Sequence, residues 1–270
     1  MRKLKKPLIL LFILGNIYAI LCGGLYFFQE SLIFHPSQLA QEHVFEFQQP
    51  FEEVFLDGDD AASLNGIHFR ATDPKGVILY FHGNAGDLQR WGEITQSFVP
   101  LGYSVIVMDY RNYGKSRGLM SEQVLYDDAD TWYAFAKAQY PQTPIALYGR
   151  SLGTTFAAYL GSRHETKNVI LETPFYSIAD EAKSRFPFLP IRSLIQYPFA
   201  TDTYINNVKA PITIFHGTSD QVIDYKHGQK LFESIKSSTK NMITIQGAGH
   251  NNLVTFEAYH EGIQALLLKE

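Results

Sequence analysis

The sequence is short of cysteine, of charged residues and of positive charge, and each shortage excludes a class of protein. Its single cysteine excludes an intramolecular disulfide framework and any multi-cysteine metal site. Charged residues make up 19% of the chain, below the roughly 25% of an average soluble domain, and 46% are hydrophobic, so the chain is not disordered. A formal net charge of −4 gives no basic surface, and we therefore expect no nucleic-acid partner.

Sequence motifs for cofactors are absent as well. The chain contains no H-E-x-x-H zinc motif, no P-loop and no G-x-G-x-x-G after an apolar strand. These motifs supply the metal ligands or the phosphate-binding loops that such groups need. We therefore expect no metal and no cofactor.

A long uncharged run of residues lies near the N-terminus. Four cations precede it: Arg2, Lys3, Lys5 and Lys6. The run covers residues 7–29 and ends at Glu30, so it exceeds the about 20 residues that cross a bilayer core. By the positive-inside rule, the cations stay in the cytoplasm and the main domain lies outside it. We predict that residues 1–29 form a basic cytoplasmic tip and an uncleaved transmembrane signal anchor, with the domain periplasmic if the cell is Gram-negative.

Three other interpretations of this run stay open. A cleaved signal peptide has a shorter apolar core, of about 7–15 residues, and a small-x-small site, and no clear A-x-A stands here. A lipoprotein would use Cys22, but the preceding Leu21 is bulkier than the small residue usual at that position. The third interpretation is a buried helix of a soluble protein. The length and the flanking charges favour the anchor.

The rest of the chain is predicted to be a tether, residues 30–50, and one domain, residues 51–270. Aromatic side chains of the tether could dock on the domain: Phe34, Phe45 and Phe47. The expected strands are 51–56, 64–69, 77–81, 103–108, 145–148, 169–171, 212–215 and 242–245. The first two flank a turn and form an antiparallel pair, and the others are short apolar runs typical of buried parallel strands. Helical patterns between them predict an α/β fold with a mostly parallel eight-stranded sheet and helices on both faces.

One interval breaks the alternation of strands and helices. The stretch between Leu171 and Pro211 is rich in prolines and aromatic residues and is too long for a plain crossover. We predict a crossover helix extended by a small cap over the sheet, at about residues 174–205.

The sequence around Ser151 carries the main chemical signal. The fifth expected strand leads directly into Gly149-Arg150-Ser151-Leu152-Gly153, and a helical run follows at once. G-x-S-x-G between a strand and a helix is the nucleophile elbow, a strained turn that exposes the serine hydroxyl at a helix N-terminus. The alternative is an ordinary glycine-rich turn with a serine cap. We predict that Ser151 is a nucleophile.

A serine nucleophile needs a base, and the base needs a carboxylate that orients it. After an elbow of this kind the acid comes first and the histidine last, each in a loop after a strand. Asp220 follows the seventh expected strand and His250 follows the eighth. We predict a Ser151–His250–Asp220 triad, with Asp224 and Glu172 as alternative acids.

The loop after the third expected strand predicts the rest of the site. It reads His82-Gly83-Asn84-Ala85-Gly86-Asp87. A loop at this place supplies one N–H of the oxyanion hole, and the residue after the nucleophile supplies the other. We predict that the backbone N–H groups of Asn84 and Leu152 form the hole. Whether Asn84 or Ala85 points to the serine stays open, and a simple glycine-rich loop is the alternative.

These motifs resemble those of α/β hydrolases of the serine-aminopeptidase-like group, and more narrowly the membrane-anchored abhydrolase-domain serine hydrolases. The matching stretches are F-H-G-N-A-G-D (81–87), D-Y-R-N-Y-G-K-S (109–116), Y-G-R-S-L-G-T (148–154), G-T-S-D (217–220), G-A-G-H (247–250) and, after an apolar segment, Y-F-F-Q-E-S-L-I-F-H-P (26–36). Asn112 and Thr154 replace glycines usual in the group without removing a catalytic group. The resemblance implies an α/β-hydrolase fold and hydrolysis of esters, thioesters or peptides.

The sequence as a whole predicts a membrane-anchored serine hydrolase of the esterase, lipase or thioesterase type. Its substrate is expected to be a small molecule or lipid with an apolar acyl part, cleaved at a carboxylic ester or thioester through an acyl-enzyme. One alternative is a serine aminopeptidase-like peptidase, which needs an acidic site for the substrate amine. For that site the cap offers Asp180, Glu181 and Asp202. The other alternative is a catalytically idle hydrolase-fold interaction module.

Overall fold

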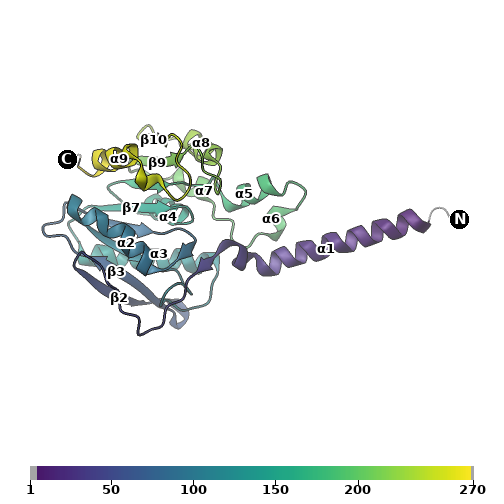
Figure 1. Ribbon diagram of the computed structural model, residues 1–270, viewed down its shortest axis with the longest axis horizontal. Coiled ribbons are helices and arrows are strands. Elements are labelled where there is room, and N and C mark those ends of the chain that lie inside the picture. Colours follow the sequence, from purple (N-terminus) through teal and green to yellow (C-terminus); the bar gives the residue numbers. More distant parts are fainter. Residues whose placement is uncertain (1–4, 269–270) are drawn as a thin grey trace.

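The centre of the fold is an eight-stranded sheet with the strand order β10-β9-β8-β7-β4-β6-β3-β2 (Figure 1). The structure, a computed structural model, describes residues 5–268, so Arg2 and Lys3 of the predicted basic tip lie outside the described residues. Strands β4 and β6 to β10 run parallel, whereas β3 is antiparallel to both β2 and β6. The prediction of a mostly parallel eight-stranded sheet, with an antiparallel pair at its start, is confirmed.

The expected strands are all present, most of them slightly longer than their apolar runs. The strands are β1 (His35–Pro36), β2 (Phe51–Asp57), β3 (Ser63–Phe69), β4 (Gly76–Phe81), β5 (Ala85–Gly86), β6 (Tyr103–Met108), β7 (Ile145–Arg150), β8 (Val169–Glu172), β9 (Ile212–Gly217) and β10 (Lys240–Ile245). Only the short strands β1 and β5 were not expected, and they pair with each other in a separate two-stranded sheet.

Helices cover both faces of the sheet. The α-helices are α1 (Lys5–Ile33), α2 (Leu88–Thr95), α3 (Glu122–Gln139), α4 (Gly153–Arg163), α5 (Ile178–Arg185), α6 (Ile191–Leu194), α7 (Thr201–Ile205), α8 (Tyr225–Ser234) and α9 (Glu257–Leu267), with 3₁₀ turns η1 (Asp59–Ala61), η2 (Gln96–Leu101) and η3 (Leu253–Thr255). In the central strand β4, Val77 and Leu79 belong to the core under α3 and α4, whereas Ile78 and Tyr80 belong to the core under α2 and α9. Every residue of β4 is buried as a result.

Helix α3 illustrates how the sequence sets an element. The Ser121 Oγ accepts the backbone N–H of Val124 at 3.3 Å, which satisfies one of the free donors at the helix start. The side chains of Leu125 and Trp132 are buried against the sheet. The helix ends at Gln139, two residues before Pro141, which cannot continue it. This helix was expected from its cap and its apolar spacing.

Between β8 and β9 the chain forms the short helices α5, α6 and α7, in the interval where the cap was expected. Helix α7 packs on α4, where the hydroxyl groups of Thr155 and Thr201 are 2.7 Å apart. Helices α5 and α6 project from the body on the side where α1 leaves it (Figure 1). We call residues 174–205 the cap.

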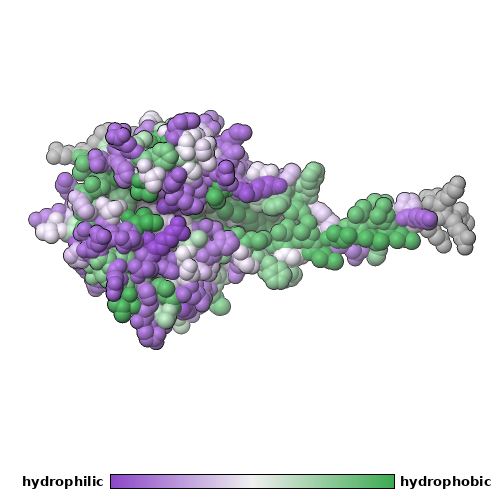
Figure 2. All heavy atoms as spheres, in the orientation of Figure 1, coloured by the Kyte–Doolittle hydropathy of each residue, from purple (hydrophilic) through white to green (hydrophobic). Residues whose placement is uncertain are grey.

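Helix α1 extends away from the body as a separate rod (Figure 1). It is uninterrupted to Ile33, four residues beyond the predicted end of the anchor at residue 29. Its surface is almost continuously hydrophobic, and the hydrophobic surface continues onto the neighbouring part of the body (Figure 2). Within residues 5–268 it is the one helix long and apolar enough to cross a membrane, a property that membrane anchors and signal sequences share.

Candidate active site

Ser151 lies on a sharp turn between β7 and α4. Its backbone φ of 51° is in the left-handed region, where a non-glycine residue is strained. A Cβ atom on Gly149 would lie 2.3 Å from the carbonyl oxygen of Gly153, and a Cβ on Gly153 would lie 2.0 Å from that of Phe81. Both positions therefore require glycine, because the turn brings the start of α4 against the ends of β7 and β4.

The structure brings Ser151, His250 and Asp220 into one hydrogen-bonded row. The His250 Nε2 is 3.1 Å from the Ser151 Oγ, and the His250 Nδ1 is 2.7 Å from the Asp220 Oδ2. The three residues come from the loops after β7, β10 and β9, at the carboxyl ends of parallel strands on one side of the sheet, with β8 between β7 and β9. With Nδ1 protonated towards Asp220, the free lone pair of Nε2 faces the serine hydroxyl.

The carboxylate of Asp220 is held in one orientation. Its Oδ1 accepts the backbone N–H groups of Val222 and Ile223 at 2.8 and 2.9 Å, and its Oδ2 lies 3.3 Å from the His216 Nε2. Burial by itself raises the pKa of Asp220, but hydrogen bonds from His216 and His250 outweigh burial and hold the pKa well below its ordinary value. The group is therefore charged at neutral pH and able to stabilise an imidazolium.

The two alternative acids are engaged elsewhere. Asp224 caps α8, where its Oδ1 accepts the N–H of Lys226 at 2.9 Å. Glu172, at the end of β8, accepts the Tyr148 hydroxyl at 2.6 Å and lies 3.3 Å from the Arg150 Nε. In the described part of the chain neither carboxylate contacts the His250 ring.

The loop after β4 runs beside the nucleophile. A Cβ atom on Gly83 would lie 3.7 Å from that of Ser151. The next residue, Asn84, has its carbonyl oxygen and side chain occupied on the far side, where the oxygen accepts the Tyr113 hydroxyl at 2.7 Å and the side chain donates to Ile33 at 2.8 Å. The N–H of Asn84 has no acceptor among residues 5–268, and the same holds for Leu152. Of the two residues left open, Asn84 lines the pocket with Ser151, and Ala85 belongs to β5.

A pocket of about 340 Å³ opens in front of Ser151. Asn84 and Leu152 line it together with the nucleophile. Its opposite wall comes from the cap and from the last residues of α1, among them Ile178 and Ile33. The site thus combines a hydroxyl with a base beside it, two candidate N–H donors and a partly apolar cavity, which are the parts needed for acyl transfer.

Sequence reasoning missed the role of Arg150 in the site. Its guanidinium donates to the His250 carbonyl oxygen at 3.3 Å and to the Asn251 side chain at 3.3 Å, while it pairs with the buried Glu172. The Arg150 guanidinium also lies over the Trp91 ring, 5.3 Å from its centroid, and the guanidinium of Arg90 lies 5.0 Å from the same centroid. Arg150 therefore supports the loop that carries the histidine. The only signal was its place inside the elbow motif.

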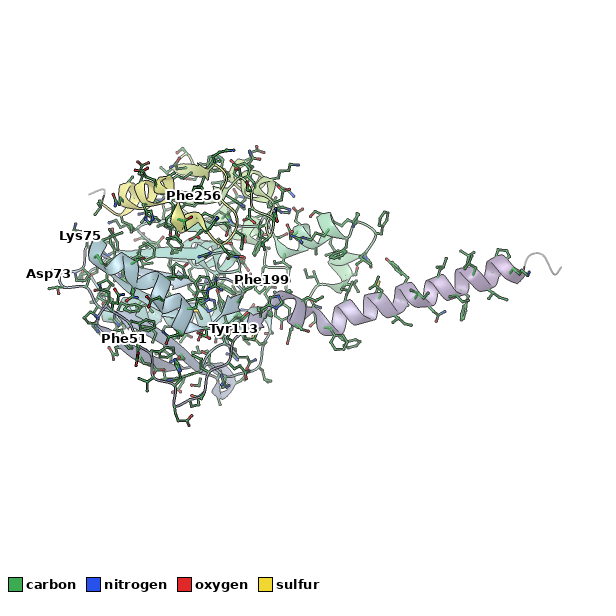
Figure 3. All side chains as sticks on the ribbon, viewed as in Figure 1. Phe51, Asp73, Lys75, Tyr113, Phe199 and Phe256 are labelled. Atoms are coloured by element: carbon green, nitrogen blue, oxygen red, sulfur yellow. The ribbon has the colours of Figure 1, made fainter. Side chains whose placement is uncertain are left out.

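Docking of the tether's aromatic side chains was expected, and Phe34 and Phe45 are buried, but the pairing of the tether with the loop beside the site was missed. Strand β1 pairs with β5 directly after Asn84, and the N–H of His35 donates to the Asn84 carbonyl oxygen at 2.8 Å. Phe34 is buried against Phe199, with ring centroids 6.1 Å apart, and Tyr113 and Phe199 lie where the body meets α1 (Figure 3). A two-residue pairing has no periodicity that a sequence could reveal.

Asp109 and Arg111 make buried polar contacts beneath the site. The Arg111 guanidinium binds both carboxylate oxygens of Asp128, at 2.8 and 2.9 Å, and both side chains are buried. Asp109 lies 3.2 Å from the His82 Nε2 and accepts the N–H of Leu88. Within residues 5–268 no group of three or more His, Cys, Asp or Glu side chains is placed to hold a metal ion.

Comparison with known proteins gives consistent matches along the chain. The family model described as serine aminopeptidase, S33, matches residues 72–201 and 193–257. The alpha/beta hydrolase domain-containing protein 17C of Xenopus tropicalis is 31% identical over 245 residues, which cover 87% of this chain and 76% of that protein.

Two solved structures share the fold. The esterase Pf2001 of Pyrococcus furiosus superposes with a TM-score of 0.67 at 20% identity, covering 87% of this chain and 98% of that one. A soluble variant of monoglyceride lipase from Saccharomyces cerevisiae, in complex with a substrate analog, gives 0.65 at 15% identity, covering 84% and 97%.

Proposed function

Because the chain belongs to the serine aminopeptidase S33 family of α/β hydrolases, we propose that it is a membrane-anchored serine hydrolase that cleaves carboxylic ester or thioester bonds of an apolar acyl substrate. The observation that carries the proposal is the row of Ser151, His250 and Asp220 in front of a pocket. A serine, a base within 3.1 Å and a charged carboxylate behind it form the arrangement that makes a hydroxyl nucleophilic.

In the proposed reaction the Ser151 Oγ attacks the acyl carbonyl carbon while the His250 Nε2 takes its proton. Asp220 holds the imidazole in the required tautomer and stabilises the imidazolium. The N–H groups of Asn84 and Leu152 donate to the developing oxyanion, which breaks down as His250 returns the proton to the leaving oxygen or sulfur. Water, deprotonated by His250, then attacks the acyl carbon. The bond between the Ser151 Oγ and the acyl group breaks, His250 returns the proton to Oγ, and the acid leaves.

The walls of the pocket favour an apolar acyl group. Opposite Ser151 lie the aliphatic side chains of Leu32, Ile33 and Ile178, with Phe175 beside them. Burial of such a chain is worth about 0.8 kcal/mol for each methylene removed from water. An acyl substrate therefore gains binding energy along this wall.

A serine aminopeptidase activity is less well supported by the same pocket. It needs an unpaired carboxylate to bind the substrate amine, and of the three acidic residues of the cap only Glu181 lines the pocket. Glu181 already lies 2.8 Å from the His227 Nε2 and 2.5 Å from the Arg185 Nε. Burial alone raises the pKa of Glu181, but these hydrogen bonds lower it below its ordinary value, so the carboxylate is already paired with Arg185 and His227.

An idle interaction module is the other alternative. A fold that serves only as a scaffold has no need of a strained serine or of a carboxylate aligned on a histidine. The φ of 51° at Ser151 and the 2.7 Å contact behind His250 therefore favour an enzyme.

The experiment that tests the proposed function is a substrate series with the full chain in detergent or nanodiscs. We expect kcat/KM for p-nitrophenyl esters from acetate to laurate to rise by about fourfold for each added methylene until the pocket is full. An aminoacyl p-nitroanilide serves as the peptidase control and should be hydrolysed far more slowly. A flat ester series, or a preference for the amide, would favour the peptidase interpretation.

We also propose that α1 is an uncleaved anchor with the catalytic domain outside the cytoplasm. The basic residues before the apolar run support this orientation by the positive-inside rule. The exposed apolar surface of α1 supports a lipid environment, since an aqueous one would make it costly.

The orientation predicts a protease result. When protease is added to cells whose outer layer is permeabilised and whose inner membrane is sealed, the catalytic domain should be digested, while a cytoplasmic marker protein stays intact. Protection of the domain equal to that of the marker would reverse the assigned orientation.

A further inference from the structure

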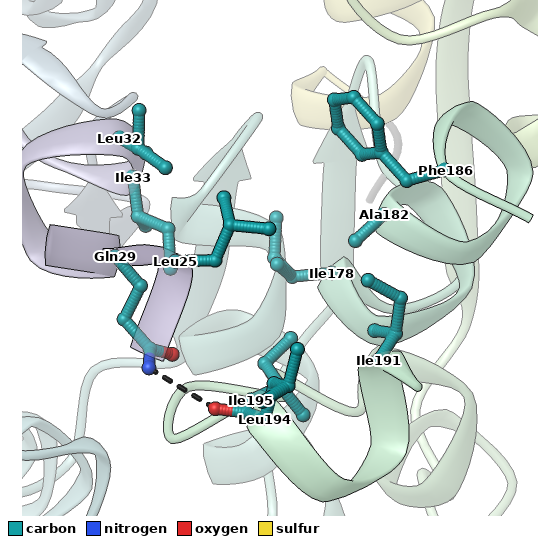
Figure 4. Close-up of a pocket in the computed structure, with 10 residues that line it drawn as sticks. All are labelled: Leu25, Gln29, Leu32, Ile33, Ile178, Ala182, Phe186, Ile191, Leu194 and Ile195. Carbon is teal, nitrogen blue, oxygen red and sulfur yellow. Dashed lines mark hydrogen bonds between the residues drawn. The ribbon is translucent and has the colours of Figure 1, made fainter. Parts of the chain in front are cut away.

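A second pocket, of about 160 Å³, lies between the end of α1 and the cap (Figure 4). Leu25 and Leu32 of α1 line one side, and Ile191 and Leu194 of the cap line the other. Gln29 is the one polar side chain among the lining residues, and its amide donates to the Leu194 carbonyl oxygen at 3.2 Å, as drawn in Figure 4. The pocket is therefore an apolar space whose single polar group is already satisfied.

This apolar pocket adjoins the pocket in front of Ser151. The residues that line both are Leu32, Ile33, Ile178, Ala182 and Phe186. All five side chains are apolar. A single apolar wall thus runs from the nucleophile, along the inner face of α5, to the side of α1.

Hydrogen bonds fix α1 as part of this wall. The Gln29 side chain accepts the N–H of Gln196 at 2.7 Å, and the Gln196 side chain donates to the Tyr26 carbonyl oxygen at 3.1 Å. The next residue of each segment continues the contact, because the Tyr197 hydroxyl donates to the Glu30 carboxylate. The end of the anchor and the cap are therefore joined into one surface.

The tip of the cap reaches far along α1. The Tyr18 hydroxyl donates to the carbonyl oxygen of Phe188 at 3.0 Å, and Tyr18 lies about 22 Å along the helix before Ile33. Tyr18 is near the middle of the uncharged run of residues 7–29. At the tip, the side chains of Phe188 and Phe186 are 89% and 51% exposed. Exposure of such apolar side chains to water is unfavourable, and contact with the apolar part of a bilayer would remove that penalty.

We propose that α1 and the cap together form an acyl-chain channel that opens within the bilayer, so that a long acyl chain held in the membrane reaches Ser151 without passing through water. The inference rests on the proposed function and on the anchor. The cap tip around Phe188 lies in the apolar layer, the chain occupies the pocket beside Leu25, and the ester or thioester lies at Ser151. Residues of the anchor helix thereby determine chain-length specificity.

Filling the second pocket, between α1 and the cap, tests the channel. In full-length protein in nanodiscs, Leu25→Trp places an indole in the pocket that only the far end of a long chain occupies. We expect kcat/KM for a palmitoyl ester to fall at least tenfold, because each methylene that can no longer be buried lowers kcat/KM about fourfold. We expect kcat/KM for a butyryl ester to stay within twofold of the parent value. The matched control, Ile20→Trp, lies on the same helix at a side chain that is 74% exposed and should change neither.

The outcomes separate the channel from the activity itself. Equal effects of Leu25→Trp on palmitoyl and butyryl esters, or no effect on either, would reject the channel and leave the serine hydrolase standing. An inactive parent protein toward butyryl esters would instead reject the proposed function, and the channel with it.

A charge at the cap tip tests entry from the bilayer. Phe188→Glu should lower hydrolysis of a long acyl chain embedded in vesicles by tenfold or more and leave a water-soluble butyryl ester unchanged, since Phe188 is exposed and lines neither pocket. Val44→Glu, at a tether side chain that is 76% exposed, is the control and should affect neither substrate.

The vesicles carry the acyl chain either as a glycerol monoester or as the thioester of a short peptide, so that the two arms identify its carrier. A selective loss in either arm supports the channel. Unchanged rates in both arms would contradict entry from the bilayer.

Discussion

Replacing Ser151 by alanine is expected to lower kcat by roughly 10⁶-fold and to abolish labelling by a fluorophosphonate. Among residues 5–268 the Ser151 hydroxyl is the one nucleophilic group hydrogen-bonded to the His250 Nε2, and alanine removes it without altering the other members of the row. Residual hydrolysis would come from the oxyanion donors and from binding alone.

The fold of this variant should stay intact, because alanine is no larger than serine and Ser151 packs through its backbone. Circular dichroism and thermal unfolding check this. The matched control is Ser162→Ala in α4, where the hydroxyl is bonded to the Tyr159 carbonyl oxygen at 2.6 Å. The control should label at the parent rate. Full labelling of Ser151→Ala would place the nucleophile elsewhere and end the proposed mechanism.

Asp220→Asn is expected to lower kcat by roughly 10⁴-fold with little effect on the fold. The asparagine keeps the shape of the side chain, but it carries no charge and its amide can donate to Nδ1, which favours the imidazole tautomer that cannot accept the serine proton. In the parent, hydrogen bonds hold the pKa of Asp220 below its ordinary value, so the charge is present throughout the neutral range. The measurement is kcat with a short ester, and the NMR chemical shifts of the two His250 ring nitrogens report the tautomer.

Two other carboxamide variants provide the comparison. Asp224→Asn weakens only the cap of α8, worth about 1 kcal/mol of stability, and should leave kcat nearly unchanged. Glu172→Gln leaves Arg150 without its buried partner and should cost about 3 kcal/mol of stability, with a far smaller loss of kcat than Asp220→Asn in the folded fraction. A larger loss of kcat in either of these variants than in Asp220→Asn would reassign the acid.

Local sequence patterns predicted those parts of the fold that local physics decides. The buried runs that became β4 and β6 to β9 needed only their apolar composition, and α3 needed only the cap at Ser121 and its spacing. The positions of Ser151, Asp220 and His250 followed from motifs that stand directly after strands. In each case neighbouring residues contain the information.

Contacts between distant segments could not be predicted in the same way. The support of the His250 loop by Arg150 joins residues a hundred positions apart, and the pairing of β1 with β5 joins a tether to a loop with two residues each. The pocket between α1 and the cap depends on contacts such as the hydrogen bond between Gln29 and Gln196, which are 167 positions apart. Neither composition nor periodicity records which surfaces meet in this way.

The pairing of β1 with β5 connects helix α1 mechanically to the candidate active site. His35 and the end of α1 hold Asn84 from behind, so a pull on the helix relative to the domain is transmitted directly to the loop beside Ser151. On the proposed anchoring, a protease that cut the chain between residues 37 and 50 would separate the domain from α1 and from the strand that braces Asn84. Release of the domain from the membrane would then also lower the proposed hydrolase activity in the same step.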